Sequence, residues 1–330
     1  MINHPSAPGP APSISFELMP PRNPSNAPKF WKMAGELVAW NPDFISVTYG
    51  AGGATHHTSR AVVGQLLAGS EVWTLAHFTC VGATRADVRQ EIAEFLATGT
   101  RAFLALRGDP PLDEPNWQPP ADGVSSAIEL IGLIHEVASE LTSGTPPTPT
   151  SSSPLRIGVA TFPDGNHFAG TSPAQEVERL LAKERAGASF AITQLFYEAD
   201  TYLRFLDAAR AAGVTIPILA GILPATSPTR LHRLAEMTGI TPPARLLNLL
   251  DDAASASRND DGRADQHDDD AAQAKAERQH QVGVEFTAAL ADEVLAGGAA
   301  GIHLYTFNQS GPALDVLANM SSEQVRHRRN

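Results

Sequence analysis

Cysteine is nearly absent from this sequence, because Cys80 is the only one among 330 residues. A single cysteine cannot form a disulfide within the chain, so a disulfide-rich scaffold is excluded and a reducing compartment is favoured. No apolar run is long enough to span a bilayer. The first residues, MINHPSAPGPAPS, lack the basic and apolar regions of a signal peptide. These absences predict a cytoplasmic protein that does not enter a membrane.

Positive charge is also scarce. The chain has 24 lysines and arginines against 36 aspartates and glutamates, which gives a formal net charge of −12. Such a balance argues against nucleic acids and anionic membrane surfaces as partners. With 42% hydrophobic residues, the chain can still bury a large core. The composition leaves open whether the protein forms a homo-oligomer.

Eight short apolar runs alternate with longer amphipathic stretches. The runs cover residues 13–19, 43–49, 72–80, 101–108, 155–162, 189–197, 214–222 and 300–307. Runs that are apolar throughout are typical of parallel strands buried on both faces. Helix signals lie between them, and Thr84 and Ser172 are expected N-caps. The pattern predicts an α/β fold, a TIM (β/α)8 barrel, as a single domain over residues 13–320.

A doubly wound sheet is the alternative α/β architecture. It usually carries a glycine fingerprint after its first strand, and the segment FELMPPR has none. We expect flexible tails at residues 1–12 and 321–330. Two inserted mobile loops are also expected, a proline-rich one at 143–154 and an acidic one at about 251–281. The acidic segment has few large apolar groups with which to offset its ordering entropy.

Polar side chains occur where the apolar runs end, and in a TIM barrel these ends meet at one mouth. They are Glu17, Thr48, His77, Asp109, Asp164, Gln194 and Tyr305. Glu17 lies between apolar residues, and partial burial would raise its pKa into the range that suits a general acid near neutral pH. The alternative is a structural carboxylate paired with Arg22 or Arg107.

His77 permits three interpretations: a metal ligand, a cofactor contact or a hydrogen-bonded core histidine. Barrel metallohydrolases usually carry His-x-His on the first strand, and that pattern is missing here. The His-Glu-x-x-His motif is missing as well. We therefore predict no metal. Gln194, an uncharged donor and acceptor among apolar neighbours, suits a heterocyclic ligand better than a phosphate.

Taken together, several segments resemble the catalytic domain of methylenetetrahydrofolate reductases. They are FELMPPR, DFISVTYGAGG, AHFTC, ALRGD, FPDGNH, RAGASFAITQLFY, AGILP and HLYTFN, in family order over residues 13–310. With only a barrel present, the chain is similar to the short bacterial form. The resemblance implies reduction of 5,10-methylenetetrahydrofolate to 5-methyltetrahydrofolate in one-carbon metabolism and methionine biosynthesis. It implies NADH or NADPH as hydride donor and usually FAD, with NADH favoured by the bacterial form.

The resemblance also implies roles for individual residues. Glu17 matches the general acid that helps open the five-membered ring of the substrate to an iminium cation. Asp109 and Gln194 match catalytic residues that also bind substrate, and Leu234 falls at a substrate-contact position. The implied cofactor contacts are Thr48, His77, Leu106, Arg107, Gly108, Phe162, His167, Lys183 and Tyr305.

The departures from the family pattern concern the tail of the flavin. Ser126 stands where the family usually has a tyrosine, and Leu234 where it usually has an aromatic residue. In the helix that holds the FAD diphosphate in the family, Arg179 and Ala182 stand at polar positions and Glu176 at an acidic position. Two routes therefore stay open, hydride transfer through FAD or directly from NADH to the iminium. Two other functions also stay open, a barrel reductase for another pterin carrier and a non-catalytic barrel that binds a pterin or nucleotide.

Overall fold

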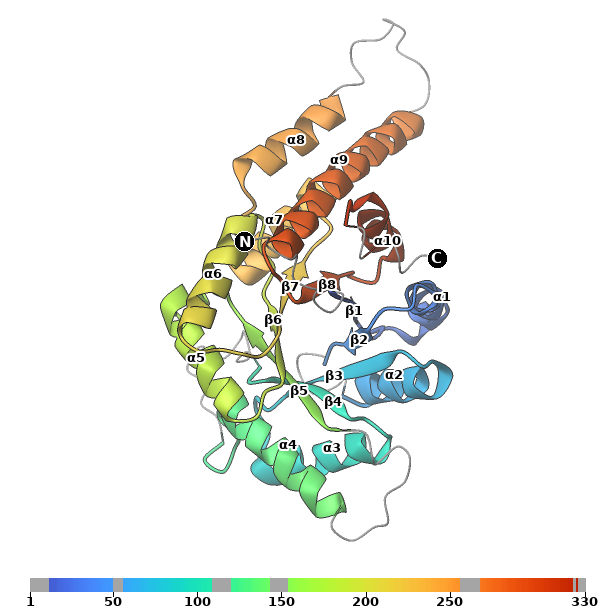
Figure 1. The fold of residues 1–330 in the computed structure, drawn as a ribbon. Coiled ribbons are helices and arrows are strands. Elements are labelled where there is room, and N and C mark those ends of the chain that lie inside the picture. The colour runs from blue at the N-terminus through green and yellow to red at the C-terminus, as the bar shows by residue number, and fades with distance from the viewer. Residues whose placement is uncertain are drawn as a thin grey trace, which may run out of the picture.

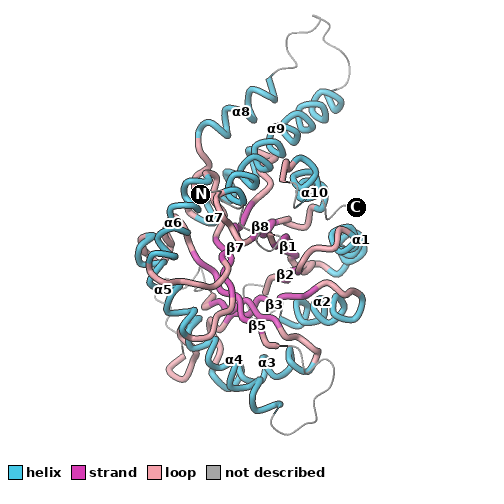
Figure 2. Tube along the Cα trace, viewed as in Figure 1, coloured by secondary structure: helices cyan, strands magenta, loops and turns pink. Residues whose placement is uncertain are grey.

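The computed structural model describes residues 12–49, 56–108, 120–142, 154–255, 268–322 and 325. Its strands close into one parallel barrel in chain order, β1 to β8, with β8 pairing back to β1 (Figures 1 and 2). The strands are β1 (Ser13–Leu18), β2 (Phe44–Val47), β3 (Trp73–Thr79), β4 (Ala102–Leu106), β5 (Arg156–Thr161), β6 (Phe190–Thr193), β7 (Ile218–Ile222) and β8 (Gly301–Tyr305). The expected TIM barrel is confirmed, and the open, doubly wound alternative is wrong.

Helices surround the barrel, as Figure 2 shows in cyan around the magenta strands. They are η1 (Pro24–Asn26), α1 (Ala27–Ala39), α2 (His56–Gly69), α3 (Arg85–Ala97), α4 (Ala127–Thr142), α5 (Pro173–Arg185), α6 (Ala199–Ala211), α7 (Pro228–Thr238), α8 (Ala244–Ser255), α9 (Asp268–Ala296) and α10 (Ser310–Asn319). Among the described residues, no helix is long and apolar enough to cross a membrane.

Two helix starts follow the expected chemistry. Thr84 Oγ1 accepts from the backbone N–H of Asp87, and the carboxylate of Asp87 accepts from the backbone N–H of Thr84. Ser172 and Gln175 form the same reciprocal box at the start of α5. Each box satisfies donors that a helix leaves without internal partners. The second box matters for function because α5 forms one wall of the site described below.

Side chains alternate between the two faces of each strand. On β1, Ile14, Phe16 and Leu18 point outward and join the large core between barrel and helices. The intervening Ser15 and Glu17 point into the barrel. Inside the barrel, toward the N-terminal ends of the strands, lies a smaller apolar cluster of Phe44, Leu75, Ala102, Leu104, Phe190, Ile192 and Leu219. The apolar filling leaves the polar inward positions near the C-terminal ends of the strands.

The expected acidic loop at about 251–281 is wrong in the parts that the structure describes. Residues 251–255 belong to α8 and residues 268–281 to α9, and these helices lie side by side and project from the barrel (Figure 1). Gln279 and Arg278 of α9 donate to the carbonyls of Leu250 and Ala253 of α8. The segment is rich in alanine, which favours helix even where charge is high.

The chain ends and the proline-rich loop fall mostly outside the described residues. Of the expected C-terminal tail, Val325 is fully buried, so this position is not part of a free tail. Ser321 also donates to the carboxylate of Asp292 through its backbone and its hydroxyl. Residues 1–11 and 143–153 lie outside the described part of the chain.

Candidate active site

A cavity of about 610 Å³ opens at the C-terminal ends of the strands. Its size lies within the usual range of small-molecule sites. Strands β1, β3, β4, β5, β6 and β8 supply the floor, and α4, α5 and α7 supply the walls. The predicted residues that line it are Glu17, His77, Leu106, Arg107, Gly108, Ser126, Phe162, Glu176, Arg179, Lys183, Gln194, Leu234 and Tyr305. Sequence positions far apart therefore meet at one mouth, as the barrel topology requires.

Glu17 lies on the floor, at the end of β1. Its side chain is 13% exposed, and burial raises the pKa of its carboxyl group from 4.5 to about 8. Oε2 lies 3.7 Å from Nε2 of His77 on β3. Among the described residues, this histidine rather than Arg22 or Arg107 is the basic side chain close to the carboxyl group of Glu17. Glu17 is therefore a protonated acid at neutral pH rather than a carboxylate held by an arginine.

His77 is itself buried, and burial lowers the pKa of its ring to about 3. The ring is therefore neutral beside Glu17. Its Nε2 has no hydrogen-bond partner among the described residues. Of the three interpretations open to this histidine, a fully hydrogen-bonded core residue does not match that observation. No three histidine, cysteine, aspartate or glutamate side chains in the described part of the chain are grouped to hold a metal ion.

Tyr305 on β8 is aligned with Glu17 across the β1–β8 ladder. Its hydroxyl donates to the carbonyl of Thr193 at 2.6 Å. Gly221 on β7 makes this possible, because a Cβ there would lie 2.1 Å from the same carbonyl and 2.7 Å from the tyrosine hydroxyl. A larger residue at position 221 would displace Tyr305 from the floor.

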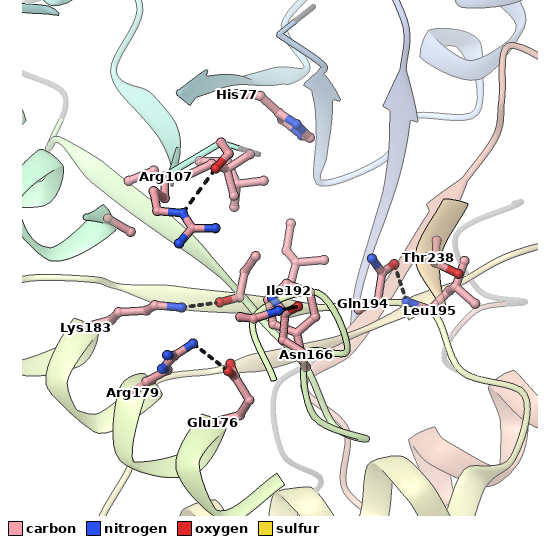
Figure 3. A pocket seen from close by; sticks show the side chains of 18 of the residues that line it. His77, Arg107, Asn166, Glu176, Arg179, Lys183, Ile192, Gln194, Leu195 and Thr238 are labelled. Atoms are coloured by element: carbon pink, nitrogen blue, oxygen red, sulfur yellow. Dashed lines mark hydrogen bonds and ion pairs between the residues drawn. The ribbon is translucent and has the colours of Figure 1, made fainter. Parts of the chain in front are cut away.

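The end of β4 brings Leu106, Arg107 and Gly108 to the cavity. Gly108 has a φ of +86°, and a Cβ there would lie 2.6 Å from Cγ1 of Val81. Only glycine adopts this turn without strain. Arg107 points into the cavity in Figure 3 and donates from Nε to the carbonyl of Gly108. Asp109 follows directly but lies outside the described residues, so its catalytic role stays a prediction.

Helix α5 forms a charged wall. Lys183 Nζ donates to the carbonyl of Ala160 at 2.8 Å, and burial lowers the pKa of its amine. One turn earlier, Arg179 contacts the carboxylate of Glu176 at 3.1 Å. Glu176 is almost completely buried and also accepts from Thr171 Oγ1 at 2.6 Å. Figure 3 shows Arg179 and Lys183 on the same helix, with Arg107 above them in the view.

Gln194 lies on the far side of the cavity from Lys183 (Figure 3). Oε1 of Gln194 accepts from the backbone N–H of Leu195 at 2.8 Å. This bond fixes the orientation of the amide and leaves its NH₂ group as the part that can donate to a ligand. Leu234, on α7, adds an apolar side chain to the lining of the same cavity.

Thr48, His167 and Ala182 do not belong to the lining residues. Thr48 donates its backbone N–H to Leu18 after β2, and His167 packs against Gly239 at the end of α7. Their cofactor roles stay predictions. The structure adds residues that sequence reasoning missed: Ser125, Ile128, Asn166, Met237 and His303. His303 could have been found from strand alternation, because it lies two positions before Tyr305 on β8 and so shares its face.

Comparisons with known proteins show the family of the chain. A family model described as Methylenetetrahydrofolate reductase matches residues 6–321. The chain belongs to the methylenetetrahydrofolate reductase family. It is 31% identical over 234 residues to the 5,10-methylenetetrahydrofolate reductase of Salmonella typhimurium strain LT2, covering 70% of this chain and 71% of that one. The Escherichia coli K12 enzyme of the same name is 28% identical over 90% of this chain and 87% of its own length.

A solved structure supports the fold alone. An uncharacterised Clostridium thermocellum protein, described as binding two copies of 5-methyl-5,6,7,8-tetrahydrofolic acid, superposes with a TM-score of 0.58 at 12% identity. The match covers 97% of this chain and 96% of the other. At that identity the likeness shows a shared barrel, and the family membership rests on the sequence matches.

Proposed function

We propose that this family member reduces 5,10-methylenetetrahydrofolate to 5-methyltetrahydrofolate with hydride from NADH. The observation that carries the proposal is the buried carboxyl group of Glu17, with a pKa of about 8, on the floor of the cavity. A carboxylic acid kept neutral at physiological pH is suited to protonate a leaving amine.

The first step needs such an acid. The substrate carries its one-carbon unit between two nitrogens in a five-membered ring, and a neutral ring of this kind accepts hydride poorly. Glu17 gives its proton to the departing nitrogen, the bond from that nitrogen to the bridging carbon breaks, and the carbon stays double-bonded to the other nitrogen as an iminium cation. Hydride then adds to this carbon and makes the methyl group, while Glu17 regains a proton from solvent through the cavity.

Two further residues would hold the reacting ring. Gln194 offers an oriented NH₂ group to a pterin carbonyl or ring nitrogen, because its oxygen is engaged by Leu195. Asp109, which follows the described end of β4, would place a carboxylate near the iminium and stabilise its positive charge. Both assignments follow the match to the family motifs and are proposals for this chain.

The charged wall fits the diphosphate of a dinucleotide. Arg107, Arg179 and Lys183 all line the cavity, and cations converging on one space favour a doubly charged ligand. These residues would hold the diphosphate of NADH or of FAD. When bound, FAD supplies a ring that can carry hydride from the nicotinamide to the folate. The proposed roles of Glu17 and Gln194 are the same whether or not FAD is bound.

An absorbance spectrum of the purified protein, before and after incubation with added FAD and gel filtration, distinguishes the two hydride routes. A stoichiometric flavin band that survives gel filtration supports the route through FAD. NADH-dependent turnover in protein that shows no such band supports direct transfer from the nicotinamide.

Turnover with a substrate panel tests the function itself. We expect NADH oxidation that depends on 5,10-methylenetetrahydrofolate and yields 5-methyltetrahydrofolate in equal amount. Faster turnover with a different reduced pterin would assign the cavity to that carrier instead. Tight folate binding with no turnover, with NADH or with NADPH, would contradict the proposal and favour a binding protein.

A further inference from the structure

Among the described residues, the floor of the cavity holds four titratable side chains, Glu17, His77, His303 and Tyr305, of which the proposed reaction uses only Glu17. Glu17 supplies a proton, whereas His77 and His303 have no assigned step. Nε2 of His77 is buried without a hydrogen-bond partner among the described residues, and the carboxyl group of Glu17 lies 3.7 Å away. An unpaired buried nitrogen is costly, so its placement beside an acid calls for a physical reason.

His303 is the second buried histidine of the floor, and two serines contact its ring nitrogens. Ser15 Oγ lies 2.8 Å from Nδ1 of His303, and Ser46 Oγ lies 3.3 Å from Nε2. The hydroxyl of Ser15 also reaches the carbonyl of Ile302 at 3.2 Å, and a carbonyl can only accept. Ser15 therefore donates its single proton to that carbonyl and accepts from Nδ1–H. With the proton on Nδ1, Nε2 of the neutral ring can accept from Ser46 Oγ, and burial, which lowers the pKa of the ring, keeps it neutral.

The other groups facing Glu17 are also uncharged. Burial lowers the pKa of His77, and burial together with His77 lowers the pKa of His303, in each case to about 3. Burial, with a contribution from Glu17, raises the pKa of Tyr305, which is therefore neutral and donates to Thr193. Charged groups in the described part of the cavity line its walls: Arg107, Arg179, Lys183 and Glu176.

We propose that His77 is a positioning residue for the acid proton: its neutral Nε2 accepts a hydrogen bond from the carboxylic acid of Glu17 and retains that proton until the substrate takes it. A small rotation of the Glu17 side chain closes the 3.7 Å gap, and such contacts commonly tighten when a ligand binds. Burial lowers the pKa of His303 and so keeps this second ring from becoming an imidazolium that would draw the proton away. The proposal rests on Glu17 being the acid of the proposed reaction.

The direction in which the pKa of Glu17 changes when His77 is replaced tests this role. A hydrogen bond donated by the acid favours its protonated form, so removing the acceptor should make Glu17 lose its proton more readily. His77→Leu removes the acceptor and fills similar space, whereas His77→Gln keeps an acceptor oxygen. In the leucine variant we expect the apparent pKa of the alkaline limb of the kcat/KM–pH profile to fall by about half to one unit, the effect of one ordinary hydrogen bond. It should return most of the way to wild type in the glutamine variant.

Two other results would overturn the proposal. An unmoved limb in His77→Leu would mean that His77 only packs or only contacts a cofactor. A limb moved to higher pH would mean that His77 is an imidazolium paired with the carboxylate, because losing a cation raises the pKa of an acid.

The carboxyl group can also be titrated without substrate. The infrared band of a protonated carboxylic acid, assigned by its loss in Glu17→Gln, should disappear at lower pH in His77→Leu than in wild type. This measurement can fail while the reductase activity stands, or hold while the activity is absent, so it separates this proposal from the proposed function.

If the leucine variant does not fold, ring ¹⁵N shifts of the wild-type protein decide. His77 should be neutral at pH 6, with an unprotonated nitrogen of acceptor type, and its signals are assigned by their loss in His77→Gln. An imidazolium at that pH would overturn the proposal.

Discussion

Replacing Glu17 by glutamine should stabilise the protein at neutral pH while destroying its acid. In the unfolded chain the carboxyl group ionises around pH 4.5, but in the folded protein it ionises only around pH 8. Between these values the unfolded state releases a proton that the folded state keeps. An acid whose pKa is raised by folding therefore costs no stability below pH 4.5 and costs increasingly more as the pH rises toward 8.

The magnitude follows from the two pKa values. Each pH unit between them costs about 1.4 kcal/mol, so moving the pKa from 4.5 to about 8 costs the folded protein about 5 kcal/mol once the pH exceeds 8. At pH 7 the cost is roughly 3 kcal/mol by the same relation. Glutamine has nearly the same shape and no charge to lose, so Glu17→Gln removes this cost.

Urea unfolding of both proteins at a series of pH values from 4 to 9 measures the difference. The free energies of unfolding should differ little with pH below 4.5, then diverge in favour of Glu17→Gln, and run parallel again above pH 8. Glu178 lies exposed on α5, and Glu178→Gln gives a matched control that removes a carboxyl group from the surface instead of the floor. A difference that does not change with pH would refute the reasoning. A difference that grows in favour of the wild type would show that Glu17 is a stabilised carboxylate.

Three further predictions concern other parts of the site. His303→Asn should make the free energy of unfolding less sensitive to acid. Because the pKa of His303 is lowered to about 3 in the folded protein, the wild type loses about 1.4 kcal/mol of stability for each pH unit below 6.5. Unfolding measured between pH 3 and 7 gives this slope for both proteins. Gly108→Ala should cost about 1–3 kcal/mol and impair ligand binding, because φ is +86° and Val81 blocks the new Cβ; thermal melts and ligand titration measure both. Arg179→Met should raise KM for NADH by about tenfold and reduce its salt dependence, whereas an unchanged KM would remove Arg179 from the nucleotide site.

Much of the fold could be predicted because the signals are local. Continuous apolar runs mark buried parallel strands, and eight such runs alternating with helices leave few architectures other than the barrel. The capping boxes at Thr84 and Ser172 lie within three residues of sequence. The helical ends of the acidic segment do not follow from its charge and its lack of large apolar groups. Alanine favours helix there, and Leu246 and Leu250 of α8 bury against partners that the sequence pattern does not reveal.

The site could be predicted only in part. Glu17, Gln194 and Tyr305 end their strands, so topology alone brings them together. The contact of His303 with Ser15 joins residues 288 positions apart, and no local sequence pattern predicts it. The buried pairing of Glu176 with Thr171 and Arg179 was missed for a different reason, because an acidic residue in the first turn of a helix usually faces water.

The most direct test of the central claim is the rate of 5-methyltetrahydrofolate formation by wild-type protein and Glu17→Gln, assayed side by side at pH 7 with NADH. Binding of folate and the circular dichroism spectrum of the variant serve as controls for the fold. The account predicts methylenetetrahydrofolate-dependent turnover in the wild type and its loss in the variant, with folate binding retained. Near-normal turnover in a folded Glu17→Gln protein would contradict it.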